Sequence, residues 1–193
     1  MASAEKERNA WLKATEQERK EFDRLGSAYI DFLNAAKTER ETVKWIEEQA
    51  TAAKFVGLQD VKNLKPGSKV LITEKHKIAI LAVIGQKPMS EGFNIVASHG
   101  DTPRIDLKPA PLYEDGGLAL FKTHYYGGIK KYQWTALPLA MHGVVIKTSG
   151  QKIEIEIGES DRDPVFTITD LLPHLAKDQM EKKMSEGVTG EGL

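Results

Sequence analysis

Apolar residues recur at three- and four-residue intervals from Glu16 to about Phe55, which predicts amphipathic helices. The apolar stripe of the first part consists of Phe22, Leu25, Tyr29, Phe32, Leu33 and Ala36. A capping-box pattern at Thr38–Glu41 predicts that a second helix begins near Thr38. We expect that helix to bury Val43, Ile46, Ala50 and Phe55.

Short runs rich in β-branched residues follow the helical region and indicate strands. Lys69–Thr73 and Lys77–Ile84 are separated by the short polar stretch Glu74–His76, which favours a hairpin with a solvated His76. Phe93–Ser98 has the pattern of a buried strand that ends at a loop. The order of helices and strands predicts an α/β fold, in which N-terminal helices precede the start of a mixed α/β sheet.

The pattern changes after Lys108. Pro109–Pro111 and Gly116-Gly117 interrupt the chain, and the residues beyond them read as short strands. The expected strands are Leu118–Tyr126, Leu137–Lys147 and Ile153–Ile157. In the last of these, isoleucine and glutamate alternate strictly, which indicates one buried and one solvated face. We therefore predict a boundary near Lys108, with residues 1–108 in one domain and residues 109–193 in a small β-rich domain.

Charge and composition exclude several classes of protein. The chain has 27 basic and 28 acidic side chains and a net charge of −1, which gives no electrostatic reason to expect nucleic acid or an anionic membrane as a partner. It has no cysteine, so disulfides and thiolate metal sites are excluded. No apolar run approaches the roughly 20 residues of a membrane helix, and the N-terminus lacks a hydrophobic signal core. We expect a soluble, cytoplasmic protein with no membrane contact.

His99 and Asp101 are the candidate functional residues, because they follow the predicted strand at its carboxyl end, where open α/β sheets bind ligands. A neutral imidazole is a good metal ligand, and a carboxylate two residues away could bind its other ring nitrogen. The hypothesis is that His99 binds a catalytic metal and Asp101 supports it. The alternative is a hydrogen-bonded structural histidine, with Asp101 as a turn former before Thr102-Pro103. The spacing alone leaves both interpretations open.

Three blocks of sequence carry a family resemblance. Ser98–Pro109, which contains His99 and Asp101, resembles the first metal-binding motif of the zinc aminopeptidases of the aspartyl aminopeptidase family. Thr123–Val145 is similar to a stretch that follows this motif in bacterial members, and Asp170–Ala176 resembles the segment that comes next. Three blocks in the family's order are far more specific than one histidine.

The resemblance implies that His99 is a zinc ligand and that Asp101 supports it in a site of two zinc ions. The other ligands and the glutamate that acts as general base lie beyond the third block in the family's order, so we expect them outside this chain. Glu47-Glu48 is the one Glu-Glu dipeptide here, but it precedes His99 in a helical pattern and is not a substitute. We therefore interpret the chain as the N-terminal part of a longer protein.

In that interpretation the intact protein is a zinc-dependent metallo-aminopeptidase, a hydrolase that removes N-terminal amino acids from peptides. The resemblance makes residues 1–108 the start of the catalytic domain and residues 109–193 an incomplete inserted domain of the dimerisation type. It also implies a homo-oligomer built from dimers, while this fragment alone is expected to be inactive. The alternative is a non-catalytic oligomerisation or binding module, in which His99 is an inert remnant.

Three further histidines follow the motif. Asp170, or the threonine before it, could cap a helix with Pro173 in its first turn, which would place His174 near a helix N-terminus. In the resembled family a histidine of the inserted domain reaches the active site of a neighbouring subunit. His174 is the candidate for this catalytic role, and His124 is the second choice. His142 is interpreted as a hydrogen-bonded sheet residue.

Overall fold

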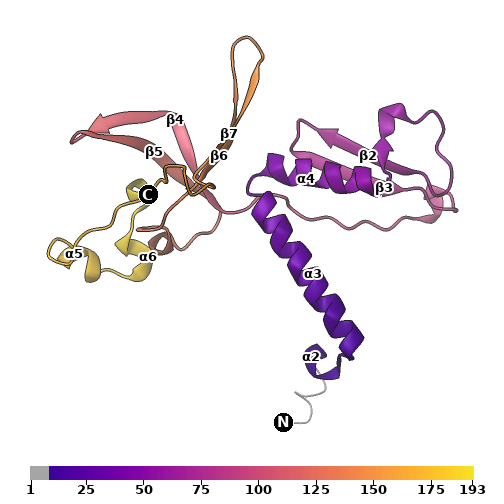
Figure 1. Cartoon of the computed structure of the whole chain (residues 1–193), viewed down its shortest axis with the longest axis horizontal. Helices are drawn as coiled ribbons and strands as arrows, with labels where there is room; N and C mark the ends of the chain where they lie inside the picture. Colours follow the sequence, from indigo (N-terminus) through magenta and orange to yellow (C-terminus); the bar gives the residue numbers. More distant parts are fainter. Residues whose placement is uncertain (1–8) are drawn as a thin grey trace. The chain divides into compact units, whose positions relative to one another are not determined.

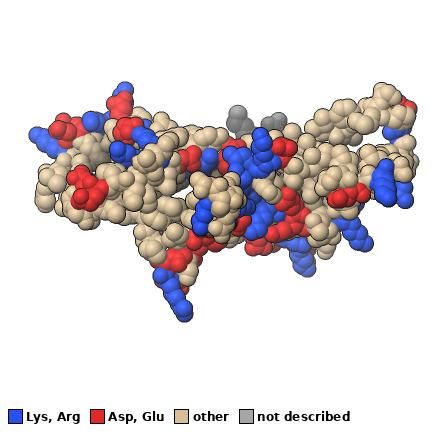
Figure 2. Space-filling view, turned by 90° about the horizontal axis from the view of Figure 1, so that it is seen from above, with Lys and Arg blue, Asp and Glu red and all other residues tan. Residues whose placement is uncertain are grey.

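The computed structural model describes residues 9–193. The chain divides into two compact units, Met1–Asp101 and Thr102–Leu193 (Figure 1). Helices and small sheets are mixed in the chain, which confirms the predicted α/β fold class. Among residues 9–193, no helix is both long enough and apolar enough to cross a membrane. Lys and Arg side chains are interspersed with Asp and Glu over the face in Figure 2.

In the described part of the first unit, three helices come first: α2 (Ala10–Lys13), α3 (Glu16–Ala35) and α4 (Glu39–Ala52). Thr15 and Thr38 cap α3 and α4, each through a complete capping box. In such a box the threonine hydroxyl and a glutamate three residues later satisfy backbone N–H groups that the first helical turn leaves free. The predicted helix start near Thr38 is therefore confirmed.

A three-stranded sheet follows the helices, with β1 (Val56–Gly57) parallel to β2 (Lys69–Glu74), and β2 antiparallel to β3 (Ile78–Val83). The turn between β2 and β3 places Lys75 and His76 at φ of 50° and 52°. Both values lie in the left-handed region, as the two central residues of a type I′ turn require, and Lys77 is a third loop residue before Ile78 pairs with Glu74. The predicted hairpin is confirmed.

The core of the first unit lies where α4 packs on β2 and β3. Val43 and Ala50 of α4 are 3% and 2% exposed, and Val70 of β2 is 4% exposed. Ile46 and Phe55 are only half-buried, so the predicted buried face of this helix is narrower than expected. Packing against a sheet on one side covers only the residues that face it directly.

The apolar stripe of α3 is mostly exposed. Near its C-terminal end Phe32 lies against Trp45 of α4, with ring centroids 4.9 Å apart. Farther toward the N-terminus Leu25 is 71% exposed and Tyr29 is 58% exposed. The predicted helix is therefore confirmed, but the face that its spacing defines remains largely in solvent.

The strand predicted at Phe93–Ser98 does not form, and this prediction was wrong. Residues 93–98 follow the short 3-10 turn Met89–Glu91 and have no ladder hydrogen bonds. Val96 is fully exposed and Ile95 is 72% exposed. A strand needs a neighbour to pair its backbone groups, and no strand within residues 9–193 pairs with this segment.

In the second unit, β4 (Arg104–Asp115) and β5 (Leu118–Tyr126) form an antiparallel hairpin. Gly116 and Gly117 make the turn at φ of 58° and 78°, and the strand predicted at Leu118–Tyr126 is confirmed. Pro109–Pro111 lies inside β4, where the register jumps between Leu107 and Leu112. Proline cannot donate to a ladder, so it is accommodated here in a bulge. The prolines near the boundary predicted at Lys108 therefore mark a bulge inside a strand. The two compact units divide earlier in the chain, between Asp101 and Thr102.

A second antiparallel hairpin joins β6 (Met141–Ile146) and β7 (Lys152–Ile157). The isoleucines of β7 are half-buried and its glutamates are exposed, as the alternation predicted. The strand expected from Leu137 is shorter, because Leu139 makes only an isolated bridge to Phe166.

The last part of the chain contains only short helices, α5 (Lys177–Met180) and α6 (Met184–Gly187). We predicted a helix capped by Asp170 or the threonine before it, with Pro173 in its first turn, and this prediction was wrong. Residues 173–175 form a single turn that Leu175 closes by donating to the Leu172 carbonyl. The Asp170 carboxylate accepts hydrogen bonds from the Leu171 N–H and the Gln179 side chain, so it orders a loop rather than capping a helix.

Candidate functional site

The His99 side chain bends back onto Asp101. Its Nδ1 lies 2.8 Å from the Asp101 carbonyl oxygen and 3.2 Å from Oδ1 of the same residue. A carbonyl oxygen can only accept, so Nδ1 is the donor, and in the neutral ring Nε2 then keeps its lone pair. The His99 side chain is 82% exposed, whereas that of Asp101 is 30% exposed. The imidazole therefore has the tautomer and the accessibility that metal binding through Nε2 requires.

This segment is held by a residue that sequence reasoning missed. Thr42 of α4 donates a 3.0 Å hydrogen bond to the carbonyl of Gly100, between His99 and Asp101. No pattern in the sequence indicates this contact, because the partners are 58 residues apart.

His99, with its Nδ1 bound to Asp101, has the chemistry of one ligand of a zinc site. Catalytic zinc usually has about three protein ligands. Within residues 9–193, no group of three or more His, Cys, Asp or Glu side chains is arranged to hold a metal ion. The acidic pair Glu47-Glu48 lies on α4, where Glu47 is 4.0 Å from His76. His99 and Asp101 thus have the chemistry of one metal ligand and a residue that supports it, and the described residues offer no further ligands beside them.

The structure brings the first two sequence blocks together in one hairpin. Arg104 pairs with Tyr126 across β4 and β5, and Asp106 pairs with His124. The Arg104 guanidinium lies 4.2 Å from the centre of the Tyr126 ring and donates to Asp106 Oδ1 at 2.8 Å. These contacts stabilise the strands that directly follow the His99 segment.

The other histidines differ in their surroundings. His174 lies exposed in the turn 173–175 and not at a helix N-terminus, so the predicted dipole effect on it is wrong. His124 donates from Nδ1 to the Tyr125 carbonyl at 2.8 Å. His142 Nε2 is 2.8 Å from Glu159 Oε1, and its side chain is only 10% exposed. This agrees with the interpretation of His142 as a hydrogen-bonded sheet residue.

Comparison with known proteins defines the class. Residues 32–191 match the family described as aminopeptidase I zinc metalloprotease (M18). This range includes the His99 motif and most of both units. The chain therefore belongs to the M18 family of zinc metalloproteases, which confirms the resemblance seen in the three sequence blocks.

Individual relatives agree with this assignment. The chain is 45% identical to the probable M18 family aminopeptidase 1 of Clostridium acetobutylicum over 190 residues, which are 96% of this chain and 41% of that protein. The crystal structure of an M18 aminopeptidase from Thermotoga maritima is similar with a TM-score of 0.87 and 44% identity, over 96% of this chain and 40% of that one. That of aminopeptidase I from Clostridium acetobutylicum has a TM-score of 0.83 and 43% identity, over 96% and 41%. The chain thus spans about two fifths of the length of these relatives.

Proposed function

We propose that this chain is the N-terminal part of a zinc-dependent metallo-aminopeptidase that removes N-terminal amino acids from peptides. The observation that carries the proposal is the hydrogen bond from His99 Nδ1 to Asp101, which leaves Nε2 free to bind metal. Membership of the M18 family supplies the class of reaction.

In this proposal His99 is one ligand of a site for two zinc ions. By accepting a hydrogen bond from Nδ1, Asp101 orients the imidazole so that Nε2 faces the metal, and it raises the basicity of Nε2. Bound zinc would polarise the scissile carbonyl and lower the pKa of a water molecule. The remaining ligands and the general base would come from the rest of a longer polypeptide.

We further propose that residues 109–193 belong to an inserted domain of the dimerisation type, in a cytoplasmic homo-oligomer built from dimers. His174 remains the candidate for a residue that reaches the active site of a neighbouring subunit, and His124 remains the second choice. The exposure of His174 in its turn supports such a reach.

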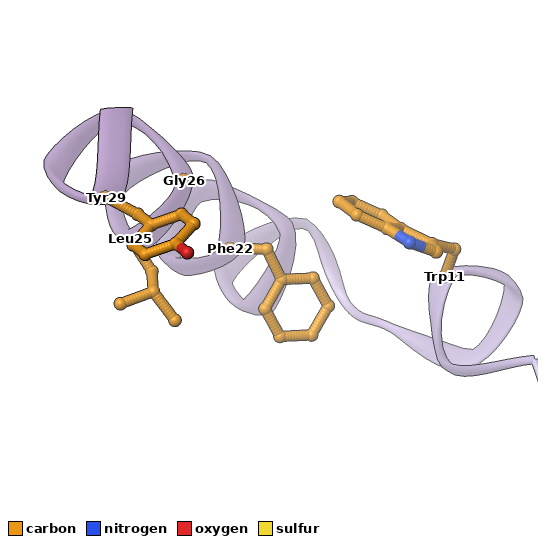
Figure 3. Close-up of a pocket in the computed structure, with 5 residues that line it drawn as sticks. All are labelled: Trp11, Phe22, Leu25, Gly26 and Tyr29. Atoms are coloured by element: carbon orange, nitrogen blue, oxygen red, sulfur yellow. The ribbon is translucent and has the colours of Figure 1, made fainter. Parts of the chain in front are cut away.

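One observation favours a second candidate function, a binding or assembly module. Trp11, Phe22, Leu25, Gly26 and Tyr29 line a shallow apolar pocket on α2 and α3 (Figure 3). The rings of Trp11 and Phe22 meet edge to face, with centroids 5.2 Å apart. An exposed apolar surface of this kind can bind another protein segment. Loss of His99 would leave such a function intact.

His99→Ala in the full-length parent protein tests the two functions. We expect loss of one equivalent or more of tightly bound zinc, measured by elemental analysis, together with at least a hundredfold loss of peptidase activity, on the order of the loss when a metal ligand or its support is removed. His76→Ala is the matched control, because His76 lies in the exposed β2–β3 turn. Unchanged zinc in His99→Ala would make His99 structural and favour the binding module.

A further inference from the structure

Thr42 connects α4 to the middle of the His99 motif. Its hydroxyl donates to the Gly100 carbonyl at 3.0 Å, and the residue is 5% exposed. Thr42 is the one buried polar or charged residue among residues 9–193. Since a buried hydroxyl needs a hydrogen-bond partner, this contact restrains the motif at the residue between His99 and Asp101.

The Thr42 hydroxyl points away from its own helix. A threonine inside a helix commonly donates to the carbonyl four residues earlier, as Thr51 of α4 does to Glu47 at 2.8 Å. The backbone N–H of Thr42 makes the ordinary helical bond to Thr38 at 2.9 Å, while the hydroxyl crosses to Gly100. In helix α4, Thr42 therefore hydrogen-bonds to the His99 motif, whereas Thr51 hydrogen-bonds only within the helix.

The space around Gly100 is a second observation that Thr42 and the motif lie close together. A Cβ atom added at Gly100 would lie 3.1 Å from Cγ2 of Thr42, which is closer than ordinary van der Waals contact. The absence of a side chain at residue 100 thus permits the motif to approach α4 this closely. The Thr42 hydroxyl bonds to Gly100, and the Thr42 methyl group lies next to the space that a side chain at residue 100 would occupy.

We propose that Thr42 is a positioning residue for the His99–Asp101 pair. The Gly100 carbonyl belongs to the peptide unit that leads into Asp101, so holding it directs Asp101 toward His99 Nδ1. That contact selects the ring tautomer whose Nε2 can bind metal. The inference rests on the proposed function, in which His99 is a zinc ligand.

The first measurement is the His99 tautomer in metal-free protein, by nitrogen-15 NMR of the imidazole at a pH where the ring is neutral. In Thr42→Val we expect the ratio of the Nδ1-protonated to the Nε2-protonated ring to fall by about twofold or more, because the loss of one hydrogen bond changes an equilibrium constant by this order. Thr42→Ser keeps the hydroxyl and should keep the tautomer. Thr51→Val, the same substitution on the same helix, should also leave it unchanged.

The second measurement is zinc affinity in the full-length parent protein, by competition with a chelator. Thr42→Val should weaken zinc binding by about 3- to 10-fold, less than a direct partner of the ligand would. Gly100→Ala should act in the same direction by steric contact. Combining it with Thr42→Ser removes Cγ2 and should restore part of the affinity, which a double-mutant cycle measures.

The controls separate failure of the inference from failure of the proposed function. If His99→Ala loses zinc while Thr42→Val keeps both tautomer and affinity, the positioning role is wrong and the zinc site stands. If His99→Ala keeps zinc, the proposed function itself is wrong. If Thr42→Val, Thr42→Ser and Thr51→Val all lower affinity equally, Thr42 acts only through the stability of α4, and the inference is overturned.

Discussion

Asp170 shows how single hydrogen bonds set the behaviour of a side chain in this protein. The Gln179 side-chain amide, at 3.0 Å, and the Leu171 N–H, at 2.8 Å, hold the pKa of the Asp170 carboxyl below its ordinary value. A weaker contact from Thr135, at 3.4 Å, acts in the same direction. Because these donors favour the charged form, they hold the loop before α5 more strongly while the carboxyl is ionised.

The sign of the pH effect follows from the lowered pKa. Asp170 stabilises the folded state above about pH 4, where an unfolded aspartate is ionised, and this contribution is lost as the pH falls through the folded pKa. We predict that Gln179→Ala raises the pKa of Asp170 toward its ordinary value, measured by NMR titration of the carboxyl carbon. Gln151→Ala, in the exposed turn between β6 and β7, should not move it. An unchanged pKa in Gln179→Ala would show that the cause is misassigned.

At the scale of elements, the capping box of α4 positions the helix that carries Thr42. Thr38 Oγ1 accepts from the Glu41 N–H at 3.3 Å, and Glu41 Oε2 accepts from the N–H groups of Thr38 and Lys37 at 2.8 and 3.0 Å. These contacts fix where α4 begins and therefore which of its residues face β2 and the His99 segment.

We predict that Thr38→Ala lowers the free energy of unfolding of the first unit by about 1 kcal/mol, since the first turn loses an acceptor for its free N–H groups. Urea denaturation followed by the fluorescence of Trp45 on α4 measures the change. Thr51→Ala is the control, because alanine is the better helix former and the Thr51 hydroxyl bonds only within the helix. Equal losses in the two variants would contradict a capping role.

At the scale of the whole molecule, the described residues 9–193 contain no group of three or more side chains arranged to hold a metal ion, and His99 is the one candidate zinc ligand among them. We predict that purified residues 1–193 do not cleave aminoacyl substrates when zinc is added, because one histidine cannot hold a catalytic zinc ion that needs about three protein ligands. Release of a fluorescent amine from an aminoacyl substrate measures this. Cleavage that a chelator abolishes would contradict the proposal that the site needs a longer polypeptide.

Features set by neighbouring residues could be predicted from the sequence alone. The start of α4 and the hairpin turns at His76 and Gly117 depend on side chains and backbone angles within about four residues. The order of three motif blocks likewise identified the family. His99 and Asp101 were found as candidates because they are only two residues apart.

Features that need a distant partner were decided by the tertiary structure. Phe93–Ser98 has the composition of a strand but lacks a neighbour to pair with, and Pro109–Pro111 is a bulge because β5 continues beside it. His174 lies in a turn because Asp170 bonds to Gln179 and does not cap a helix. The contact of Thr42 with Gly100 joins residues 58 positions apart. Local patterns determine turns and helix ends, whereas strand pairing and contacts across the fold depend on which surfaces meet when the chain folds.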